Sequence, residues 1–471
     1  MSVETAYQLD GQLHHPDDVD FQAWLKDVHD RHRKPTCMCS GGPDGIGLDM
    51  TVALIRGTYY IKRMPFTGTH HAPGCEHYEL PELLSGEATA LRAVSENTIT
   101  GISTLNLGFK VGLKADEAKE EKPKGASKPK PMDNKASRSQ PKLTLLGLLH
   151  YLYGQTHFNH WSPRMAGKRF YGRLQYFITQ VVERSDTRKF HLNDRFWMPP
   201  KWSKDKAEAN ERLFYRFTNK LKPNGTMRPL GIVVGEVRSM TETSIGNKRV
   251  ALKHTKEPIF ADESIIKHLE KKYPYAMQVL SEPDSDFHVL MIATVECSSR
   301  KNLNADQMSL MVVDQDWLPI ESSDDFELID GLKPNRYFNV PLRYDISSDF
   351  NLPSAVLTDT LMPTAIYIHD EPMDSVEMAD LFVECVAADA GEGIETLVWF
   401  SAESAVPKMP PSTYHQTHVA EEPQSADLEA NAAAEHLADQ DEPPVQPSET
   451  DVTHDLTADE YSEYAANSSP M

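Results

Sequence analysis

Three of the five cysteines lie close together in the sequence, and several histidines accompany them. Cys37 and Cys39 form a C-x-C pair within T-C-M-C-S-G-G-P-D-G, and Cys75 follows in T-G-T-H-H-A-P-G-C-E-H. Thiolates and imidazoles are ligands that Zn²⁺ prefers, and structural zinc sites collect four of them in a tetrahedron. Glycines and prolines beside both clusters allow the tight turns that bring such ligands together. The spacing therefore predicts a zinc site.

The fourth ligand has two candidates. His71 gives the order C-x-C…H-x-x-x-C, whereas His77 gives C-x-C…C-x-H, the ligand order of SWIM-type fingers, in which the central gap is usually shorter. We favour His71 because His-Ala-Pro-Gly-Cys makes a compact turn, and we keep His77 as the alternative. Four protein ligands leave no open position, so the predicted Zn²⁺ is structural. The competing interpretations are three unligated thiols or a redox site.

Two elements of the first hundred residues are expected to position these ligands. Residues 50–55 and 58–64 are β-rich runs joined at Arg56-Gly57, which predicts a hairpin between the two ligand clusters. A helix is expected over residues 18–33, because four apolar side chains recur there at helical spacing. These side chains are Phe21, Trp24, Leu25 and Val28.

The other two cysteines have a different setting. Cys297 ends the run M-I-A-T-V-E-C, and Cys385 lies in L-F-V-E-C-V-A-A. Both runs are rich in apolar residues, and an unligated cysteine behaves as a small apolar side chain. Both thiols are therefore predicted to be core residues.

Charge is distributed unevenly along the chain. The formal net charge is −22, from 48 basic and 70 acidic residues. Residues 110–260 sum to +17, whereas residues 261–408 sum to −19 and residues 409–471, which contain no Lys or Arg, sum to −14. A basic middle therefore lies within an acidic chain, and this segment is where a nucleic-acid partner is expected.

Within this basic middle, residues 161–173 interleave cations with aromatic side chains. We predict a helix over residues 164–183, preceded by another over 143–153, in a helix-turn-helix-like pair. Arg169 and Arg173 would share one helix face, where they can meet phosphates. The alternative is an ordinary solvated face that pairs with the acidic segments. The candidate nucleic-acid-binding residues are Arg164, Lys168, Arg169 and Arg173.

Length and composition predict a multidomain α+β protein. A chain of 471 residues corresponds to two or three domains. Residues 114–141 combine repeated Lys and Pro with few large apolar residues, which predicts a disordered linker. Residues 409–471 are interpreted as an acidic disordered tail. The remaining parts are an N-terminal helix and zinc-binding β-hairpin module (1–113), a basic helical and strand region (142–260) and an acidic α/β domain (261–408).

The sequence also bears on the compartment. No apolar run approaches the roughly 20 residues of a membrane span, and the start MSVETAYQLDGQLHH lacks the pattern of a signal peptide. We therefore expect a cytoplasmic protein with reduced cysteines and no membrane partner.

The acidic domain is expected to contain an αβββαβ series, which resembles the core of restriction-endonuclease-like folds. Those nucleases hold Mg²⁺ with a carboxylate and an acid-x-Lys motif. The matching places here are P-S-A (353–355) and A-I-Y (365–367), and no lysine lies between Lys333 and Lys408. The domain is therefore interpreted as degenerate. Four acidic residues remain as cation candidates: Asp345, Asp349, Asp359 and Asp370.

Motifs for other chemistries are missing from the sequence. It contains no G-x-x-x-x-G-K-[ST] phosphate loop, no G-x-S-x-G elbow and no H-E-x-x-H. Glu236 and His254, both on predicted strands, are a weak candidate for an acid–base pair.

Several strings resemble an uncharacterised bacterial domain family that is known by three N-terminal cysteines. The most specific is K-R-M-P-F-T-G-T-H-H-A-P-G-C (62–75), and further matches are L-L-H-Y-L (148–152), W-S-P-R-M-A-G-K-R (161–169), R-P-L-G-I-V-V-G-E (228–236) and A-V-L-T-D-T (355–360). The resemblance covers residues 35–370. It implies a setting in chromosomes, plasmids and integrative conjugative elements, and it brings no activity.

The leading hypothesis is a non-enzymatic, zinc-containing, nucleic-acid-associated accessory protein of a mobile genetic element. Its expected partners are DNA and other proteins of that element. One alternative is a divalent-metal-dependent nuclease of the restriction-endonuclease-like class. Another is a protein-binding adaptor that uses the zinc module or the acidic tail as its contact surface.

Overall fold

The structure, a computed structural model, describes residues 6–413 except 40–46, 56, 65–66, 73–74, 76, 82–83, 87–91, 98–99, 115–140, 224–226, 244–245, 283–284, 299–300, 345–350, 374 and 392. The predicted linker lies outside the described residues apart from its first and last residue. The predicted tail lies outside them beyond Thr413. None of the described helices combines the length and apolar composition needed to cross a bilayer.

The N-terminal module is a small sheet covered by one helix. The predicted hairpin is present, and its strands pair from Met50↔Arg63 to Ile55↔Thr58. Gly57 lies in the turn with φ of 87°, a conformation that glycine adopts without a steric penalty. The predicted helix is also present. The strand order is β2-β1-β3-β4-β5, with bounds β1 Tyr7–Leu9, β2 Gln12–His14, α1 Phe21–Asp30, β3 Thr36–Cys37, β4 Leu48–Ile55 and β5 Thr58–Arg63.

The basic middle folds as helices and short strands. The Thr144 side chain accepts a hydrogen bond from the Gly147 amide, which caps α3 (Leu145–Gly154). The helix α4 (Tyr171–Glu183) begins seven residues later than predicted. Residues Pro163–Met165 instead form a single 3₁₀ turn. Gly167 then adopts φ of 69°, outside the helical region. The third helix of this region is α5 (Ala207–Lys220).

Five strands close into a barrel. Their order is β13-β14-β15-β17-β16, and β16 pairs again with β13. The β15–β17 pairing is parallel, whereas the other four pairings are antiparallel. A β-bulge between Val237 and Ser239 bends β13, so that its first half pairs with β16 and its second half with β14. The bounds are β13 Gly231–Glu242, β14 Lys248–Leu252, β15 Ile259–Ala261, β16 His288–Cys297 and β17 Leu303–Val313.

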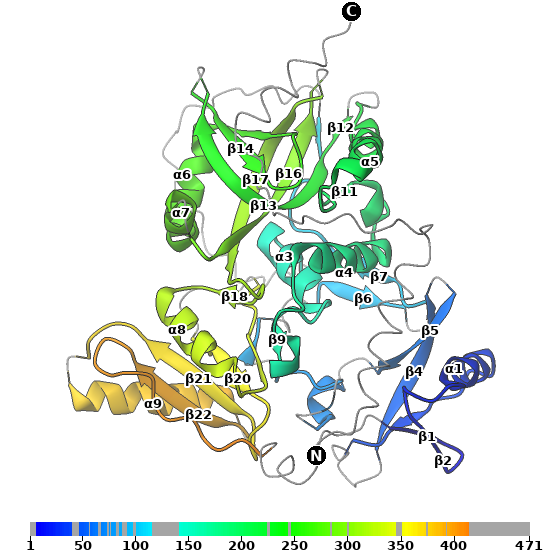
Figure 1. Ribbon diagram of the computed structural model, residues 1–471, viewed down its shortest axis with the longest axis vertical. Coiled ribbons are helices and arrows are strands. Elements are labelled where there is room, and N and C mark those ends of the chain that lie inside the picture. The colour runs from blue at the N-terminus through cyan, green and yellow to red at the C-terminus, as the bar shows by residue number, and fades with distance from the viewer. Residues whose placement is uncertain are drawn as a thin grey trace, which may run out of the picture. The chain divides into compact units, whose positions relative to one another are not determined.

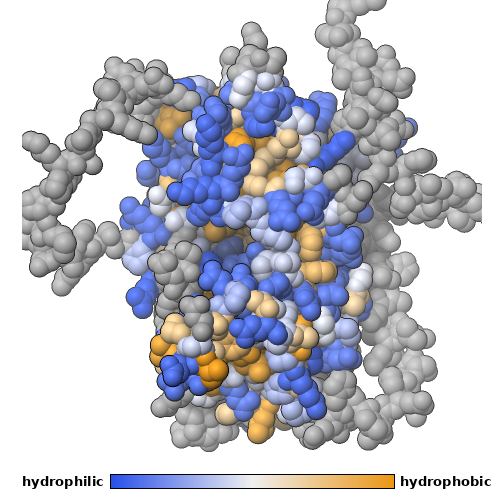
Figure 2. All heavy atoms as spheres, turned by 90° about the vertical axis from the view of Figure 1, so that its left-hand side faces the viewer, coloured by the Kyte–Doolittle hydropathy of each residue, from blue (hydrophilic) through white to orange (hydrophobic). Residues whose placement is uncertain are grey.

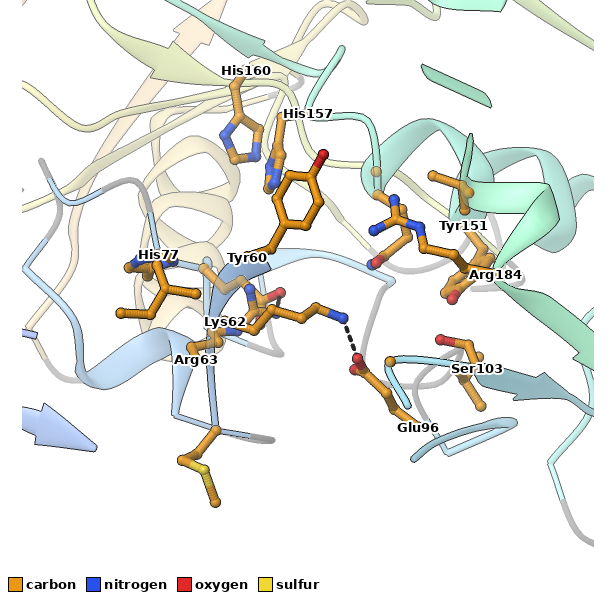
Figure 3. A pocket seen from close by; sticks show the side chains of 18 of the residues that line it. Tyr60, Lys62, Arg63, His77, Glu96, Ser103, Tyr151, His157, His160 and Arg184 are labelled. Atoms are coloured by element: carbon orange, nitrogen blue, oxygen red, sulfur yellow. Dashed lines mark hydrogen bonds and ion pairs between the residues drawn. The ribbon is translucent and has the colours of Figure 1, made fainter. Parts of the chain in front are cut away.

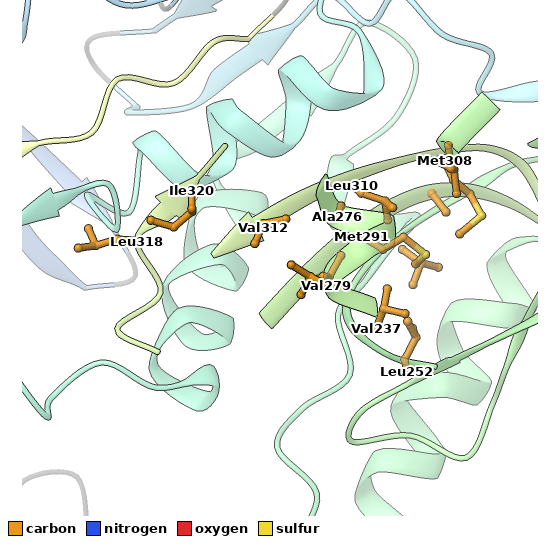
Figure 4. Close-up of a cluster of buried hydrophobic side chains, with 14 of the residues drawn as sticks. Val237, Leu252, Ala276, Val279, Met291, Met308, Leu310, Val312, Leu318 and Ile320 are labelled. Atoms are coloured by element: carbon orange, nitrogen blue, oxygen red, sulfur yellow. The ribbon is translucent and has the colours of Figure 1, made fainter. Parts of the chain in front are cut away.

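Alternation along the strands separates the barrel interior from the layer outside it. On β16, Val289, Met291 and Ala293 join the interior core, which Figure 4 shows in part. Leu290 and Ile292, which point the other way, join a second core with α3 and α4. Figure 1 shows these helices against the barrel. One outer side of the barrel is therefore buried by helices.

Two helices connect β15 to β16. Asp262 caps α6 (Glu263–Lys272) by accepting a hydrogen bond from the Ile265 amide. The helix α7 (Pro274–Ser281) follows. The boundary predicted between residues 260 and 261 falls inside β15, so strands from both predicted regions build one barrel.

The acidic domain contains the predicted αβββαβ series, built on the strand order β22-β21-β20-β19-β9. The β21–β22 pairing is parallel, and the remaining pairings of this sheet are antiparallel. The restriction-endonuclease-like assignment stays a prediction. The bounds are β9 His160–Trp161, α8 Ser323–Leu332, β19 Phe338–Asn339, β20 Ala355–Leu357, β21 Thr364–His369, α9 Val376–Ala390 and β22 Glu395–Phe400.

Short strands complete the described structure. β6, β7 and β10 form one small sheet, β8 pairs with β12, and β11 and β18 extend the barrel sheet. Their bounds are β6 Val94–Glu96, β7 Ser103–Leu105, β8 Gly112–Lys114, β10 Ser185–Thr187, β11 Phe196–Trp197, β12 Met227–Pro229 and β18 Pro319–Ile320.

The surface around α9 carries apolar side chains. Val376, Met378 and Leu381 are exposed on this helix, and Figure 2 shows apolar residues gathered on that face. The buried positions of α9 are Val386 and Ala390. Cys385 is exposed and Cys297 is half-buried, so the prediction that both are core residues is wrong for Cys385. Its apolar neighbours in the sequence were misleading because only one side of α9 is buried.

Candidate metal centre

Three cysteines and one histidine converge in the N-terminal module. The ligand atoms of Cys37, Cys39, His71 and Cys75 all lie within 4.8 Å of one another, and all four residues are buried. Among the described residues, this is the group in which at least three potential His, Cys, Asp or Glu ligands come together. The ligand set that the sequence predicts is therefore assembled by the fold.

The separations match a metal tetrahedron and not a disulfide. Sγ of Cys37 and Sγ of Cys75 are 3.8 Å apart, and Nδ1 of His71 lies 3.3 Å from Sγ of Cys39. Zn–S bonds of about 2.3 Å give tetrahedral edges of about 3.8 Å. A disulfide would bring two sulfur atoms to about 2.05 Å. The cysteines of this group are free thiols.

Strand pairing and one turn hold the ligands in place. Cys37 ends β3, where it pairs with Leu48 of β4, and Cys39 follows two residues later. The β4–β5 hairpin then returns the chain toward the 3₁₀ turn Gly68–His70. After this turn, the Cys75 amide donates to the Ala72 carbonyl at 2.8 Å. The predicted compact turn thus places His71 and Cys75 together, with 3.6 Å between Nδ1 and Sγ.

The electrostatics of the cluster favour a bound cation. The Cys39 sulfur and burial raise the pKa of Cys37 to about 11, and the Cys37 and Cys39 sulfurs together with burial raise the pKa of Cys75. The pKa of Cys39 is lowered by the Cys37 and Cys75 sulfurs, so one thiol of the three ionises readily. Closely packed thiols therefore resist forming three thiolates by themselves. A divalent cation supplies the missing positive charge, and its binding releases the protons. The chemistry and the geometry of the donor set both fit Zn²⁺.

His77 lies beside the cluster but is not one of the four converging ligands. Its Nε2 is 2.7 Å from the Tyr7 hydroxyl, and its ring centroid lies 5.5 Å from that of His71. Its backbone amide donates to Sγ of Cys75 at 3.5 Å. The structure therefore favours His71 as the fourth ligand. Both histidines are compatible with the spacing, and only the fold separates them.

The predicted nucleic-acid-binding residues divide into one buried and three exposed side chains. Arg169 is 9% exposed, and its guanidinium donates to the carbonyls of Phe158 and His160. Its carbon Cζ also lies 4.6 Å from the centre of the Phe158 ring. Because α4 begins at Tyr171, the prediction that Arg169 shares a helix face with Arg173 is wrong. The hydrogen bonds of Arg169 to these carbonyls instead stabilise the loop before α4.

The other three predicted cations, Arg164, Lys168 and Arg173, are exposed. Phe170 is one of the aromatic side chains that the sequence interleaves with these cations, and it was expected on the apolar face of the predicted helix. Phe170 is 49% exposed, with Arg173 and Lys201 on its ring at 5.8 and 5.9 Å from the ring centroid. Lys201 is 31 residues away in the sequence from Phe170, so no local pattern announces this contact.

Of the predicted acid–base pair Glu236 and His254, Glu236 has a different histidine, His288, as its partner. Glu236 is 3% exposed, and its carboxylate contacts His288 Nδ1 at 2.6 Å and Lys253 Nζ at 2.8 Å. Burial favours a higher pKa for Glu236, but His288 and Lys253 outweigh it and lower this pKa. His254 instead packs its ring on Tyr171, with 4.3 Å between centroids. His288 comes from β16, a strand that barrel closure brings next to β13.

The acidic residues considered for a nuclease do not converge in the described part of the chain. Asp359 is fully buried and accepts two hydrogen bonds at 2.8 Å from the Arg336 guanidinium. Asp370 is exposed. Asp345 and Asp349 lie outside the described residues. The carboxylate of Asp359 is therefore engaged in a buried ion pair.

Fold and site together define an α+β protein with a buried Cys₃His cluster and a five-stranded barrel. The model of a family described as "Protein of unknown function (DUF1173)" matches residues 7–402, and the chain belongs to this family. The predicted membership of an uncharacterised family is thereby confirmed. No curated protein and no solved structure matches the chain.

Proposed function

We propose that this protein is a non-enzymatic, zinc-containing binder of single-stranded nucleic acid that serves a mobile genetic element. The observation that carries the proposal is the exposed Phe170 ring between Arg173 and Lys201. Non-specific single-strand binders combine stacking on aromatic rings with cations that follow the phosphates. A ring 49% exposed with two flanking cations supplies both parts at one point of the surface.

The same surface continues onto the barrel. Lys201 and Lys253 both lie close enough to His254 to lower its pKa by their charge, after burial as the larger cause. Lys253 directly follows β14. Two and four residues earlier on the same side of the strand lie Ala251 and the exposed Arg249. A basic path therefore runs from Phe170 along β14.

Aromatic and polar side chains extend this path across the barrel. Arg249 pairs with Thr241 on one neighbouring strand and with Phe260 on the other, and Phe260 pairs in turn with Asn304. The four side chains form one row over β13, β14, β15 and β17. Phe260 is half-buried and the other three are exposed. We call Phe170, Arg173, Lys201, Lys253, Arg249 and Phe260 the basic–aromatic surface.

The connectivity of the barrel supports this placement. The five barrel strands lie in the order first, second, third, fifth and fourth along the chain, and the fourth pairs with the first to close the barrel. Helices connect the third strand to the fourth. OB barrels have the same arrangement. Those barrels bind oligonucleotides and oligosaccharides on the face of their second and third strands. Here these strands are β14 and β15. A shared connectivity does not assign a function by itself, so the side chains of the surface carry the proposal.

The zinc site has a structural part in this proposal. Four buried protein ligands leave no position for a substrate, so the metal would stabilise the N-terminal module. The nuclease alternative is weaker, because Asp359 is held by Arg336 and the matching motif positions carry no lysine. Among the described residues, no contact favours the protein-binding adaptor over the nucleic-acid binder.

The test is fluorescence anisotropy with a labelled oligothymidylate of about 20 nucleotides, longer than the site of one OB barrel. The Phe170→Ala variant should weaken binding by about 5- to 150-fold, because stacking of one base on an aromatic ring contributes about 1–3 kcal/mol. Lys201→Gln should make the binding constant fall less steeply with salt concentration, by the amount expected for the loss of about one phosphate contact.

Tyr215→Ala is the matched control. This ring is also 49% exposed and also lies under a cation, Lys301, at 4.4 Å from its centroid, but it belongs to α5 and not to the basic–aromatic surface. Equal losses of oligothymidylate affinity in Phe170→Ala and Tyr215→Ala would contradict the placement of the binding site on the basic–aromatic surface. No binding by the wild type at low salt would end the proposal.

A further inference from the structure

A large cavity lies beside the metal centre. Its volume is about 880 Å³, within the range of about 300–1,000 Å³ typical of small-molecule sites. Its walls come from β5, from β6 and β7, from α3 and α4, and from residues 339–344. None of the lining residues belongs to β14 or β15, so the cavity is separate from the basic–aromatic surface.

One wall is the outward side of β5. Tyr60 and Lys62 are two residues apart and therefore point to the same side of the strand. Tyr59 and Ile61, on the other side, pack against the core of the metal module. Figure 3 shows Tyr60 and Lys62 in the cavity, with Lys62 joined to Glu96. The Tyr60 ring is 45% exposed, which leaves its face open to a ligand.

The cavity carries cations and hydroxyls. Lys62, Arg63 and Arg184 line it together with two carboxylates, those of Glu79 and Glu96. Lys62 is paired with Glu96, and Arg63 is paired with Glu79. Arg184 comes from the opposite wall, directly after α4. Serine hydroxyls add donors and acceptors between these charges: Ser85, Ser95, Ser103 and Ser185.

Two histidines follow α3 and form another wall. The rings of His157 and His160 meet edge to face, with 4.8 Å between centroids. His157 is exposed and His160 is half-buried. Burial, together with Arg169 and Arg63, lowers the pKa of His160 strongly. A neutral imidazole carries one hydrogen-bond donor and one acceptor.

A buried acceptor on this wall has no partner. Asn159 is 8% exposed and lines the cavity. Its amide group donates to the Val340 carbonyl at 2.9 Å, whereas its Oδ1 has no hydrogen-bond partner. This oxygen is inaccessible to solvent, so it does not face a ligand in the cavity.

We propose that this cavity binds a mononucleotide, with Tyr60 against the base, Lys62 and Arg184 toward the phosphate, and Glu96 as acceptor for the sugar hydroxyls. The size of the cavity, an open aromatic face, cations on two walls and a carboxylate are the elements that a phosphorylated sugar with a flat base requires. His157 and His160, which line the cavity, add the polar groups that distinguish one base from another.

The experiment is isothermal titration calorimetry of the full chain with the four ribonucleoside 5′-monophosphates, and with adenosine and inorganic phosphate as partial ligands. At least one monophosphate should bind, and its nucleoside and phosphate alone should each bind about tenfold more weakly or worse. Tyr60→Ala should weaken binding of that monophosphate by about tenfold, and Tyr60→Phe should restore it because the ring is kept. Lys62→Gln should weaken the monophosphate but not the nucleoside.

Phe170→Ala is the control, because it changes the basic–aromatic surface and leaves the cavity intact. It should keep wild-type affinity for the nucleotide. Unchanged binding in both Tyr60→Ala and Lys62→Gln would place the nucleotide elsewhere and overturn the proposal, as would the absence of binding by all four monophosphates. Zinc content and thermal unfolding of each variant show that the chain is folded.

Discussion

The N-terminal metal module and the barrel are stabilised in different ways. Among the described residues, the core of the module contains eleven buried apolar or cysteine residues, and three of these are the cysteine ligands. In the same part of the chain, the core that fills the barrel and reaches the neighbouring sheet contains thirty-four such residues, none of them a cysteine. A small core buries too little apolar area to offset the entropy of its chain, so it needs a further source of stability. We therefore expect the folding of the module, and not that of the barrel, to depend on a bound metal.

Removal of the metal should have the largest effect and should be confined to the module. Cys75→Ser, or a strong chelator, should release one zinc, whose apparent binding free energy in such sites is about 10–16 kcal/mol. Hydrogen exchange should then show loss of protection in β4 and β5, while β16 and β17 stay protected.

Cys385→Ser is the control for this experiment, because its thiol is exposed on α9. It should keep the zinc. A metal-free protein with normal protection in β4 and β5 would remove the distinction between the two regions.

Truncation of a buried side chain inside the barrel should give the second largest effect, because it leaves an empty space in the core. Met291 is fully buried in the barrel interior (Figure 4), and Met291→Ala should lower the free energy of unfolding by about 2–5 kcal/mol. Urea denaturation measures this loss, and zinc content should stay unchanged. Met378→Ala, at an exposed position of α9, should have little effect. Loss of zinc in Met291→Ala would show that the two regions are coupled.

A low pH should destabilise the second core, in which α3 and α4 pack against the outer side of the barrel. Burial lowers the pKa of His150 to about 3, and its Nδ1 accepts a hydrogen bond from the Tyr344 amide at 2.8 Å. The unfolded state therefore binds a proton that the folded state refuses, so stability is complete above about pH 6.5 and falls as the pH drops toward 3. Between pH 7 and pH 5 this single group should cost about 2 kcal/mol.

Urea denaturation at both pH values checks this expectation. His150→Asn should show a smaller loss between pH 7 and pH 5 than the wild type. His268→Asn, on the exposed side of α6, should keep the wild-type difference. An unchanged difference in His150→Asn would contradict the assignment.

The smallest effect concerns the histidine beside the metal. His77→Gln should retain zinc and lower stability by about 0.5–1.5 kcal/mol, because it loses the contact with the Tyr7 hydroxyl. His71→Gln should release zinc. Zinc analysis of the two variants compares the ligand with its neighbour, and the opposite result would make His77 the fourth ligand.

Local signals predicted much of the fold. The α1 helix and the β4–β5 hairpin lie where the pattern of apolar side chains and turn residues places them. The predicted start of α4 was wrong because the helical turn that begins at Pro163 ends after Met165, and Gly167 then adopts φ of 69°. The series in the acidic domain was correct, although its relation to nucleases is not decided by element order.

The barrel could not be predicted, because its closure depends on pairings between distant strands. The contact between β13 and β16 joins residues about sixty positions apart, and the parallel pair β15–β17 has no local signature. The cavity beside the metal centre has the same origin. Its walls come from segments that only the fold brings together, and no spacing in the sequence relates Tyr60 to His157.

The sequence by itself determined the chemistry of the metal centre. Three thiols and nearby histidines flank a hairpin, and these are the ligands that Zn²⁺ prefers. Only the tertiary structure decided which histidine completes the tetrahedron, which arginine is buried and which aromatic ring lies exposed between cations. These outcomes depend on the distance between atoms and on burial, and both are set by packing between residues that are remote in the sequence.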